Sequence, residues 1–294
     1  MSWMGIAESS PIGPLHIAAL AEDTGPPILF LHGVTRVWRD WTGVTATLGH
    51  RWRPYCLDFR GHGDSARAPG QYYVKQFVDD AVHVAKQTIN QPFVVVGHSL
   101  GAMVACGVAE RLKDQVIGVV LEDPPFGTMG SRIGTLPFLN QFRGIQEIMR
   151  QERWHDIADL AKTLGDLTIR DPNSERTFRL GDVRDAATLR FNAACLIKMD
   201  PEVLTPVIEG DWLKGFPWER IVAGIDCPTL LLQADVTTGG MLFDEDVKTM
   251  IDSVRDLTVI RFPKTAHQIH TTALEAYLRV VAPFLESLTF ENPI

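Results

Sequence analysis

Short apolar runs alternate with stretches of helical spacing along the first part of the chain. The runs at residues 28–31 and 93–96 are continuous and rich in aliphatic residues, which is typical of strands buried on both faces of a sheet. Strands are expected at residues 15–20, 28–31, 54–58, 93–96 and 116–121. Helices are expected at residues 38–48, 74–88 and 102–112. This alternation predicts a parallel sheet with helices on both faces and right-handed crossovers.

The alternation stops after residue 125 and returns near residue 225. The intervening segment has helical stretches and no strand-like run, and its expected helices cover residues 139–153, 155–164, 185–198 and 201–209. Beyond it, strands are expected at 229–233 and 257–262, with helices at 245–253 and 272–288. The sequence therefore predicts one core, made of residues 1–125 and 225–294, with a helical insertion at 126–224.

A Gly-x-Ser-x-Gly pattern, Gly97-His98-Ser99-Leu100-Gly101, lies between an expected strand and an expected helix. A sharp strand-to-helix turn would hold Ser99 in a strained conformation and expose its hydroxyl above the sheet edge. The helix N-terminus behind it would favour a nearby negative charge. Ser99 is therefore the candidate nucleophile, and the alternative is an ordinary glycine-rich turn.

Three further features accompany this motif: His32-Gly33 after a strand, the segment Asp58–Ser65 with its Asp-x-Arg-Gly-x-Gly-x-Ser pattern, and a histidine after the last strand. Together they resemble the lid-bearing α/β-hydrolase fold over nearly the whole chain. The core matches well, whereas the insertion matches only in position and helical character. The resemblance implies an α/β fold with a mostly parallel central sheet flanked by helices, and a helical lid. It also implies a mainly structural role for Asp58–Ser65.

A serine hydroxyl is a poor nucleophile at neutral pH and needs a base to take its proton. The resemblance places that base after the last strand, where Pro263-Lys264-Thr265-Ala266-His267 follows. Family members more often have glycine at the position of Ala266, which is a mild departure. His270 is the rival base, and a surface-loop role is the alternative for His267.

The imidazole needs a carboxylate to orient it, and two aspartates are candidates. Asp235 follows the strand at 229–233, but most family members carry their acid a couple of residues further on, where this chain has Thr237. Asp123 follows the strand at 116–121, where some relatives, such as haloalkane dehalogenases and certain lactonases, carry the acid. We favour Asp123 and keep Asp235 as the alternative, because either could be a turn-forming or capping residue.

An oxyanion would need two donors, for which the resemblance implies the backbone N–H groups of Leu100 and Val34. His62 and His98 are expected to hold loops by hydrogen bonds. Arg36, Trp38, Arg39 and Trp41 could line the pocket mouth or pack on the sheet. Aromatic residues of the insertion could line a pocket, although more of them are expected in its core: Phe126, Phe138, Phe142, Trp154, Trp212, Phe216 and Trp218.

Composition narrows the classes of partner. The net charge is −8 with no basic run, which argues against a nucleic-acid or anionic-membrane partner. The four cysteines lie far apart and lack metal-ligand spacing. The sequence has no recognisable signal peptide and no apolar run long enough for a membrane span. A cytoplasmic location is therefore the expectation.

These observations favour a serine hydrolase that cleaves a carboxylic ester or lactone of a mainly apolar small molecule, through an acyl-enzyme on Ser99 and without a metal or organic cofactor. A C–C bond hydrolase or an amide hydrolase with the same residues is an alternative. A non-catalytic small-molecule receptor built on a hydrolase shell is another. Serine at the turn, where aspartate would be needed, argues against a dehalogenase or an epoxide hydrolase. The natural substrate and the oligomeric state stay open.

Overall fold

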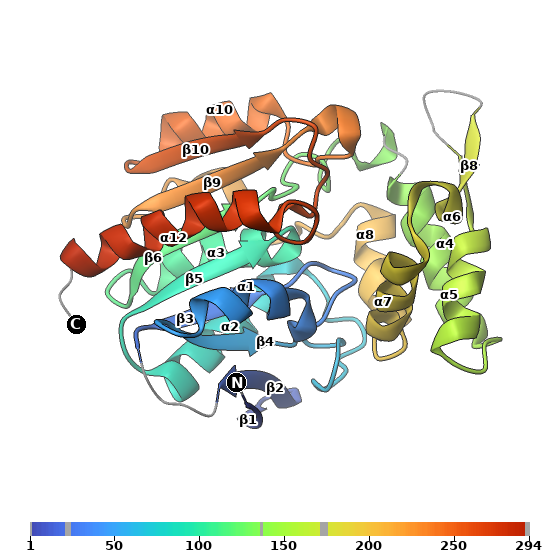
Figure 1. The fold of residues 1–294 in the computed structure, drawn as a ribbon, viewed down its shortest axis with the longest axis horizontal. Coiled ribbons are helices and arrows are strands. Elements are labelled where there is room, and N and C mark those ends of the chain that lie inside the picture. Colours follow the sequence, from blue (N-terminus) through green and yellow to red (C-terminus); the bar gives the residue numbers. More distant parts are fainter. Residues whose placement is uncertain (1, 21–24, 136–137, 171–175, 292–294) are drawn as a thin grey trace.

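The computed structural model describes residues 2–20, 25–135, 138–170 and 176–291, and an eight-stranded sheet lies at its centre (Figure 1). Its strands are β1 (Trp3–Ser10), β2 (Gly13–Leu20), β3 (Pro27–Leu31), β4 (Arg53–Leu57), β5 (Phe93–His98), β6 (Val116–Glu122), β9 (Thr229–Ala234) and β10 (Leu257–Phe262). They are ordered β1-β2-β4-β3-β5-β6-β9-β10. The pairs β1–β2 and β2–β4 are antiparallel and the others are parallel, as the alternating pattern predicts for the core.

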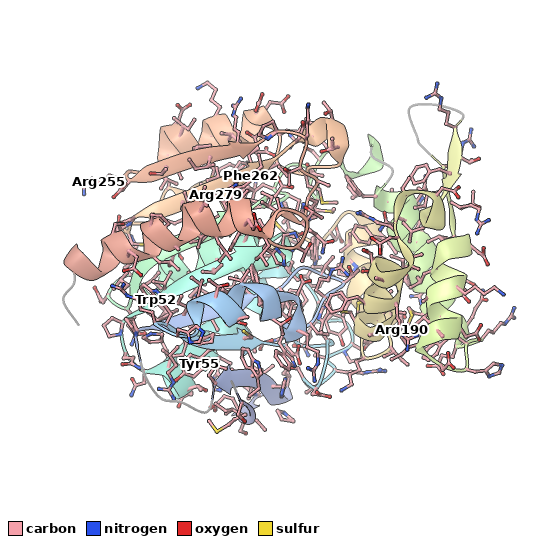
Figure 2. All side chains as sticks on the ribbon, viewed as in Figure 1. Trp52, Tyr55, Arg190, Arg255, Phe262 and Arg279 are labelled. Carbon is pink, nitrogen blue, oxygen red and sulfur yellow. The ribbon has the colours of Figure 1, made fainter. Side chains whose placement is uncertain are left out.

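Side chains of the buried strands alternate between two apolar layers. In β3, Leu29 and Leu31 pack into a layer with α2 (Val74–Val84) and α3 (Leu100–Arg111). Ile28 and Phe30 pack into the opposite layer with α1 (Thr42–Leu48) and α12 (Leu274–Glu291). Figure 2 labels Trp52 and Tyr55, which are each 2% exposed and belong to opposite layers. Burial on both faces explains why these strands read as continuous apolar runs.

The chain between β6 and β9 is mainly helical. It forms α4 (Phe138–Gln151), α5 (Ile157–Asp166), α6 (Leu180–Val183), α7 (Ala186–Leu196), α8 (Thr205–Glu209) and α9 (Trp218–Val222). Figure 1 shows α4 to α8 beyond the edge toward which the parallel strands point. The expectation that this segment has no strand is wrong, because β7 (Thr168–Arg170) and β8 (Thr177–Arg179) form a small antiparallel pair. Strands of three residues are too short to show a periodic pattern.

Other elements were either not expected from the sequence or differ from the expectation at their ends. β1 was not expected, because its residues are mostly exposed or half-buried and carry little apolar signal. The helix expected at 74–88 is α2 followed by a π-turn (Ala85–Ile89), which ends at Asn90 with a left-handed φ of 47°. A short helix, α11 (Ile269–Thr272), precedes α12, and α10 (Asp244–Ser253) lies where it was expected. Within the described ranges, no helix is long and apolar enough to cross a bilayer.

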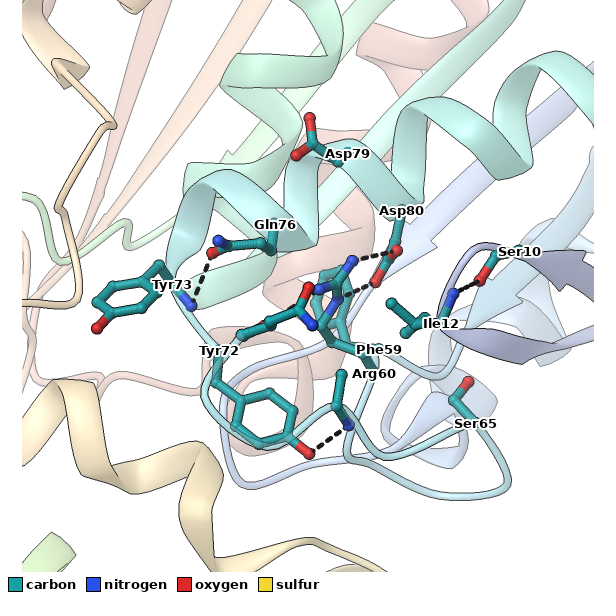
Figure 3. Close-up of polar contacts among 12 residues, drawn as sticks. Ser10, Ile12, Phe59, Arg60, Ser65, Tyr72, Tyr73, Gln76, Asp79 and Asp80 are labelled. Carbon is teal, nitrogen blue, oxygen red and sulfur yellow. Dashed lines mark hydrogen bonds and ion pairs between the residues drawn. The ribbon is translucent and has the colours of Figure 1, made fainter.

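A buried ion pair fixes the turn after β4 against α2 (Figure 3). The Arg60 guanidinium donates from Nε and Nη2 to the two carboxylate oxygens of Asp80, at 2.6 Å each. Both residues are 4% exposed. This bidentate geometry, together with the donation from Arg60 Nη1 to the Gln71 carbonyl at 3.2 Å, gives the Asp58–Ser65 segment its position.

Replacing Arg60 by methionine should therefore lower the free energy of unfolding by about 3–5 kcal/mol, because Asp80 would stay buried without its partner. Arg111→Met is the matched control, since Arg111 forms an exposed pair with Asp79 at 2.6 Å, and it should cost no more than about 1 kcal/mol. Urea unfolding of the two variants measures the difference. Equal losses would contradict the structural role given to the buried pair.

Candidate active site

Ser99 occupies the sharp turn between β5 and α3. Its φ of 55° and ψ of −116° are strained for a residue with a side chain, and the residue is 5% exposed. A Cβ on Gly97 would lie 2.1 Å from the Gly101 carbonyl oxygen. A Cβ on Gly101 would lie 1.9 Å from the Leu31 carbonyl oxygen. Only glycine at both positions lets the helix and the strands approach this closely, which is the reason for the two glycines in the motif.

Asp123 and His267 come together from distant parts of the chain. Asp123 follows β6 with a φ of 47°, is fully buried, and its Oδ2 lies 2.6 Å from His267 Nδ1. The carboxylate also accepts hydrogen bonds from the backbone N–H groups of Ala234, Met241 and Leu242, at 3.1, 2.7 and 3.3 Å. When Nδ1 donates to Asp123, the His267 Nε2 lone pair is left to accept a proton.

The structure does not bring Asp235 to His267. Asp235 caps a short turn after β9, where its Oδ1 accepts from the Thr237 N–H and hydroxyl at 2.9 and 2.6 Å. Its Oδ2 accepts from the Lys264 N–H at 2.8 Å. These hydrogen bonds, that of the Thr237 hydroxyl first, lower the pKa of Asp235. Of the two candidate acids, Asp123 therefore has the position that orients the histidine, and Asp235 has the capping role.

One cavity is lined by both Ser99 and His267. Arg36 and Arg184 also line it, and so do further residues of the core and of the insertion: Gly33, Val34, Thr35, His98, Phe138, Gln141, Phe142, Thr238, Gly239, Met241, Ala266, Gln268 and Thr272. The lining is thus mixed in polarity. The sequence alone did not identify Arg184, Gln141 and Gln268, because an isolated polar residue in a helix or a connecting loop gives no signal of which cavity it faces.

The aromatic residues of the insertion divide as the sequence suggests. Phe138 and Phe142 line the cavity. Phe126 stacks on Trp218 with ring centroids 4.4 Å apart, and Trp212 is fully buried. Trp38 and Trp41 likewise pack in the core, at 7% and 0% exposure. Most of these aromatic rings therefore hold the fold together.

Of the two residues expected to donate to an oxyanion, Val34 lines the cavity and Leu100 directly follows the cavity-lining Ser99. Leu100 is the first residue of α3, so its N–H has no acceptor within the helix. Val34 is the residue after Gly33, and both line the cavity. Among the residues that the structure describes, neither N–H donates to another backbone carbonyl outside the regular elements. His62 Nε2 lies 2.5 Å from the Val34 carbonyl oxygen and holds this loop, as expected of a loop-fastening histidine.

His270, the rival base, lies in a buried ionic cluster. The residue is fully buried, its Nδ1 is 2.8 Å from Glu122 and its Nε2 is 3.3 Å from Asp40. Burial alone would lower the pKa of His270, but the carboxylates of Glu122 and Asp40 outweigh burial and raise it to about 10. The ring also stacks on Trp41 at 4.3 Å. Both ring nitrogens of His270 face carboxylates and the residue does not line the cavity that holds Ser99, so its position does not suit a base, and His267 is left as the candidate base.

His98 separates the two histidines. Its ring centroid is 4.6 Å from that of His267 and 5.1 Å from that of His270. Burial, and then the positive charges of its neighbours, lower the pKa of His98 well below the usual value. Its Nε2 lies 3.1 Å from the His267 carbonyl oxygen, so a neutral His98 can donate there and fasten the His267 loop.

A separate group of potential metal ligands lies outside the cavity. Ligand atoms of His16, Asp58 and Asp64 lie within 4.8 Å of one another. The buried Asp58 carboxylate already pairs with His16 Nδ1 at 2.7 Å and accepts from the Trp38 and Asp64 N–H groups at 2.8 and 3.2 Å. These hydrogen bonds already give the Asp58 carboxylate its partners, so the cluster is explained as part of a structural turn that needs no ion.

A sequence model of the alpha/beta hydrolase family matches residues 28–282, which is most of the chain. The chain belongs to the alpha/beta hydrolase family. The chain is 34% identical to epoxide hydrolase B of Mycobacterium tuberculosis over 112 residues. That alignment covers 37% of this chain and only 32% of the relative, so it spans about a third of the other protein.

Solved structures of other alpha/beta hydrolases share the whole fold. A thermophilic esterase from Thermogutta terrifontis is similar with a TM-score of 0.69 at 18% identity, over 98% of this chain and 99% of the other. The enol-lactonase from Burkholderia xenovorans LB400 is similar with a TM-score of 0.69 at 17% identity, over 93% of this chain and 96% of the other. At these sequence identities, the structural similarity establishes only the fold of this protein.

The contrast between the two aspartates gives a direct test. Asp123→Asn should lower the turnover rate by about 10²–10⁴-fold, because an amide cannot stabilise the imidazolium and favours the wrong tautomer. Asp235→Asn is the control and should keep near wild-type turnover, since it changes only a cap. Steady-state kinetics on an activated ester measures both. A large loss in Asp235→Asn with little loss in Asp123→Asn would contradict the assignment.

Proposed function

We propose that this protein is a serine hydrolase that cleaves a carboxylic ester or lactone through an acyl-enzyme on Ser99. One observation carries the proposal: His267 is paired with the buried Asp123 at 2.6 Å and lines the same cavity as Ser99. The strained turn that presents Ser99 at the start of α3 supports it. Membership of a hydrolase family and a fold shared with an esterase and an enol-lactonase agree with it.

In the proposed reaction, Ser99 Oγ attacks the substrate carbonyl while His267 Nε2 takes the hydroxyl proton. The N–H groups of Val34 and Leu100 would stabilise the oxyanion. Collapse of the tetrahedral intermediate breaks the bond to the alkoxide, which leaves with the proton from His267. Water, deprotonated by His267, then attacks the acyl-enzyme and releases the carboxylic acid and free Ser99. No step requires a metal or an organic cofactor.

The cavity favours a small substrate. Its volume is about 120 Å³, below the roughly 300–1,000 Å³ of sites that bury drug-sized ligands. Phe138, Phe142 and Met241 provide an apolar part of the wall. We propose that residues 126–224 act as the lid, because α4 and the segment around Arg184 belong to this insertion and line the cavity.

Epoxide hydrolysis is the reaction named for one relative, but this chain does not have the nucleophile for it. In this fold, epoxide hydrolases and dehalogenases require an aspartate at the turn, and this chain has Ser99. A serine ester intermediate fits acyl transfer. The relative is aligned over only 32% of its length, so its activity carries little weight here.

A substrate panel tests the reaction class. Purified protein should hydrolyse nitrophenyl esters of short acyl chains and a simple lactone, and Ser99→Ala should abolish this turnover. Amide and ring-fission diketone substrates in the same panel distinguish amide and C–C bond hydrolysis. Turnover of the amide or diketone alone would overturn the ester assignment.

A fluorophosphonate probe, which reacts covalently with an activated serine, tests the alternative that the protein is a non-catalytic receptor. It should label wild-type protein once, at Ser99, and fail to label Ser99→Ala. Absence of labelling and of turnover in folded wild-type protein would contradict a hydrolase and favour a receptor.

A further inference from the structure

Two arginines face the proposed active site. Arg36, which is 9% exposed, and the half-buried Arg184 both line the cavity that holds Ser99 and His267. Both also line an adjoining pocket whose wall is made mostly of insertion residues, and Thr35 and Gln141 line both spaces. Among the described residues, no aspartate or glutamate lines either space. A protein with a net charge of −8 therefore has a cavity whose lining carries positive charge.

The Asp40 carboxylate offsets part of the charge of Arg36. Its Nε lies 3.8 Å from Asp40 Oδ1, and Asp40 Oδ2 lies 3.3 Å from His270. The other nitrogen of His270 faces Glu122 at 2.8 Å. Arg36, Asp40, His270 and Glu122 thus form a connected group of ionisable side chains, of which only Arg36 lines the cavity.

Neutral side chains hold Arg36 in place. Its Nη2 donates to the Gln268 side-chain oxygen at 2.7 Å, and its Nη1 donates to the Asn192 side-chain oxygen. These contacts orient the guanidinium without adding negative charge. Arg36 is therefore a fixed source of positive potential at the wall of the cavity.

Arg184 lacks a direct contact of this kind, although the charge of the neighbouring Asp185 partly opposes the lowering of its pKa. No described residue forms a hydrogen bond or an ion pair with its guanidinium. The adjacent Asp185 is exposed and caps α7, where its carboxylate accepts from the Thr188 N–H and hydroxyl at 2.8 and 2.9 Å. Burial, and then the charge of Arg36, lower the pKa of Arg184, but a guanidinium stays protonated at neutral pH. A bound anion would relieve both penalties.

We propose that the substrate hydrolysed at Ser99 carries a carboxylate, which binds Arg184 while Arg36 adds positive potential beside it. A planar guanidinium matches a carboxylate in a bidentate geometry. Gln141 and Thr35 provide polar groups next to this site, and the apolar wall at Phe138 and Phe142 contacts the carbon skeleton. This inference rests on the proposed function for its reaction, but the anion site itself does not depend on catalysis.

Matched substrates test it. The anionic substrate is a nitrophenyl half-ester of glutaric acid, and its neutral counterpart carries a methyl cap on the free carboxylate. Wild-type protein should prefer the anionic ester. Arg184→Gln should lower kcat/KM for that ester by about 10–100-fold, mainly through KM, because it removes a charge-assisted hydrogen bond. The neutral ester should be hydrolysed at an unchanged rate.

Arg190→Gln is the matched control, because Arg190 is an exposed arginine of the same insertion, on α7 (Figure 2). It should leave kcat/KM unchanged for both esters. Arg184→Lys should retain part of the preference, since it keeps the charge and loses the bidentate geometry. If Arg184→Gln has the same kcat/KM as wild type for both esters, the anion site is refuted, whereas the proposed hydrolase activity is not.

Binding of free glutarate separates the two proposals. Glutarate should raise the melting temperature of wild-type protein and of Ser99→Ala, but not of Arg184→Gln. If neither ester is hydrolysed and this shift is still seen, the proposed function fails and the anion site stands. If glutarate shifts no variant, the anion site is overturned.

Discussion

The close approach of α3 to strands β3 and β5 is the constraint on which the rest of the site depends. Gly97 and Gly101 permit it, because a Cβ at either position would collide with backbone at about 2 Å. The same approach accompanies the strained backbone of Ser99, whose φ is 55° and ψ −116°, and Ser99 lines the cavity. Without those two glycines the chain could keep its sheet, but the hydroxyl would have no fixed place relative to His267.

A second requirement is electrostatic. Glu122 and Asp123 are neighbours at the end of β6, and each binds a different histidine. Asp123 orients the cavity-facing His267, whereas Glu122 joins the buried cluster of His270, Asp40 and Arg36. Asp123 lies just beyond the strand with a φ of 47°, and the two carboxylates bind different histidines: His267 lines the cavity, whereas His270 is buried between Glu122 and Asp40. The ring of His98 lies close to both, and its burial lowers its pKa well below the usual value.

Much of the core could be predicted from the sequence, because strands buried on both faces leave continuous apolar runs and the serine motif lies at a strand-to-helix junction. Choosing between Asp123 and Asp235 could not be done from sequence. The choice depends on where the loop after β9 folds, since its Met241 and Leu242 N–H groups bind the Asp123 carboxylate. The half-exposed β1, the three-residue strands β7 and β8, and the inward-facing Arg184 also lack a periodic signature.

A crystal structure of the protein after reaction with a phosphonate ester would show whether Ser99 and His267 act together. We expect a covalent bond to Ser99 Oγ, His267 Nε2 within hydrogen-bond distance of the adduct, and a phosphonyl oxygen about 2.7–3.1 Å from the N–H groups of Val34 and Leu100. A phosphonate attached elsewhere, or His267 turned away from Ser99 while still bound to Asp123, would contradict this expectation.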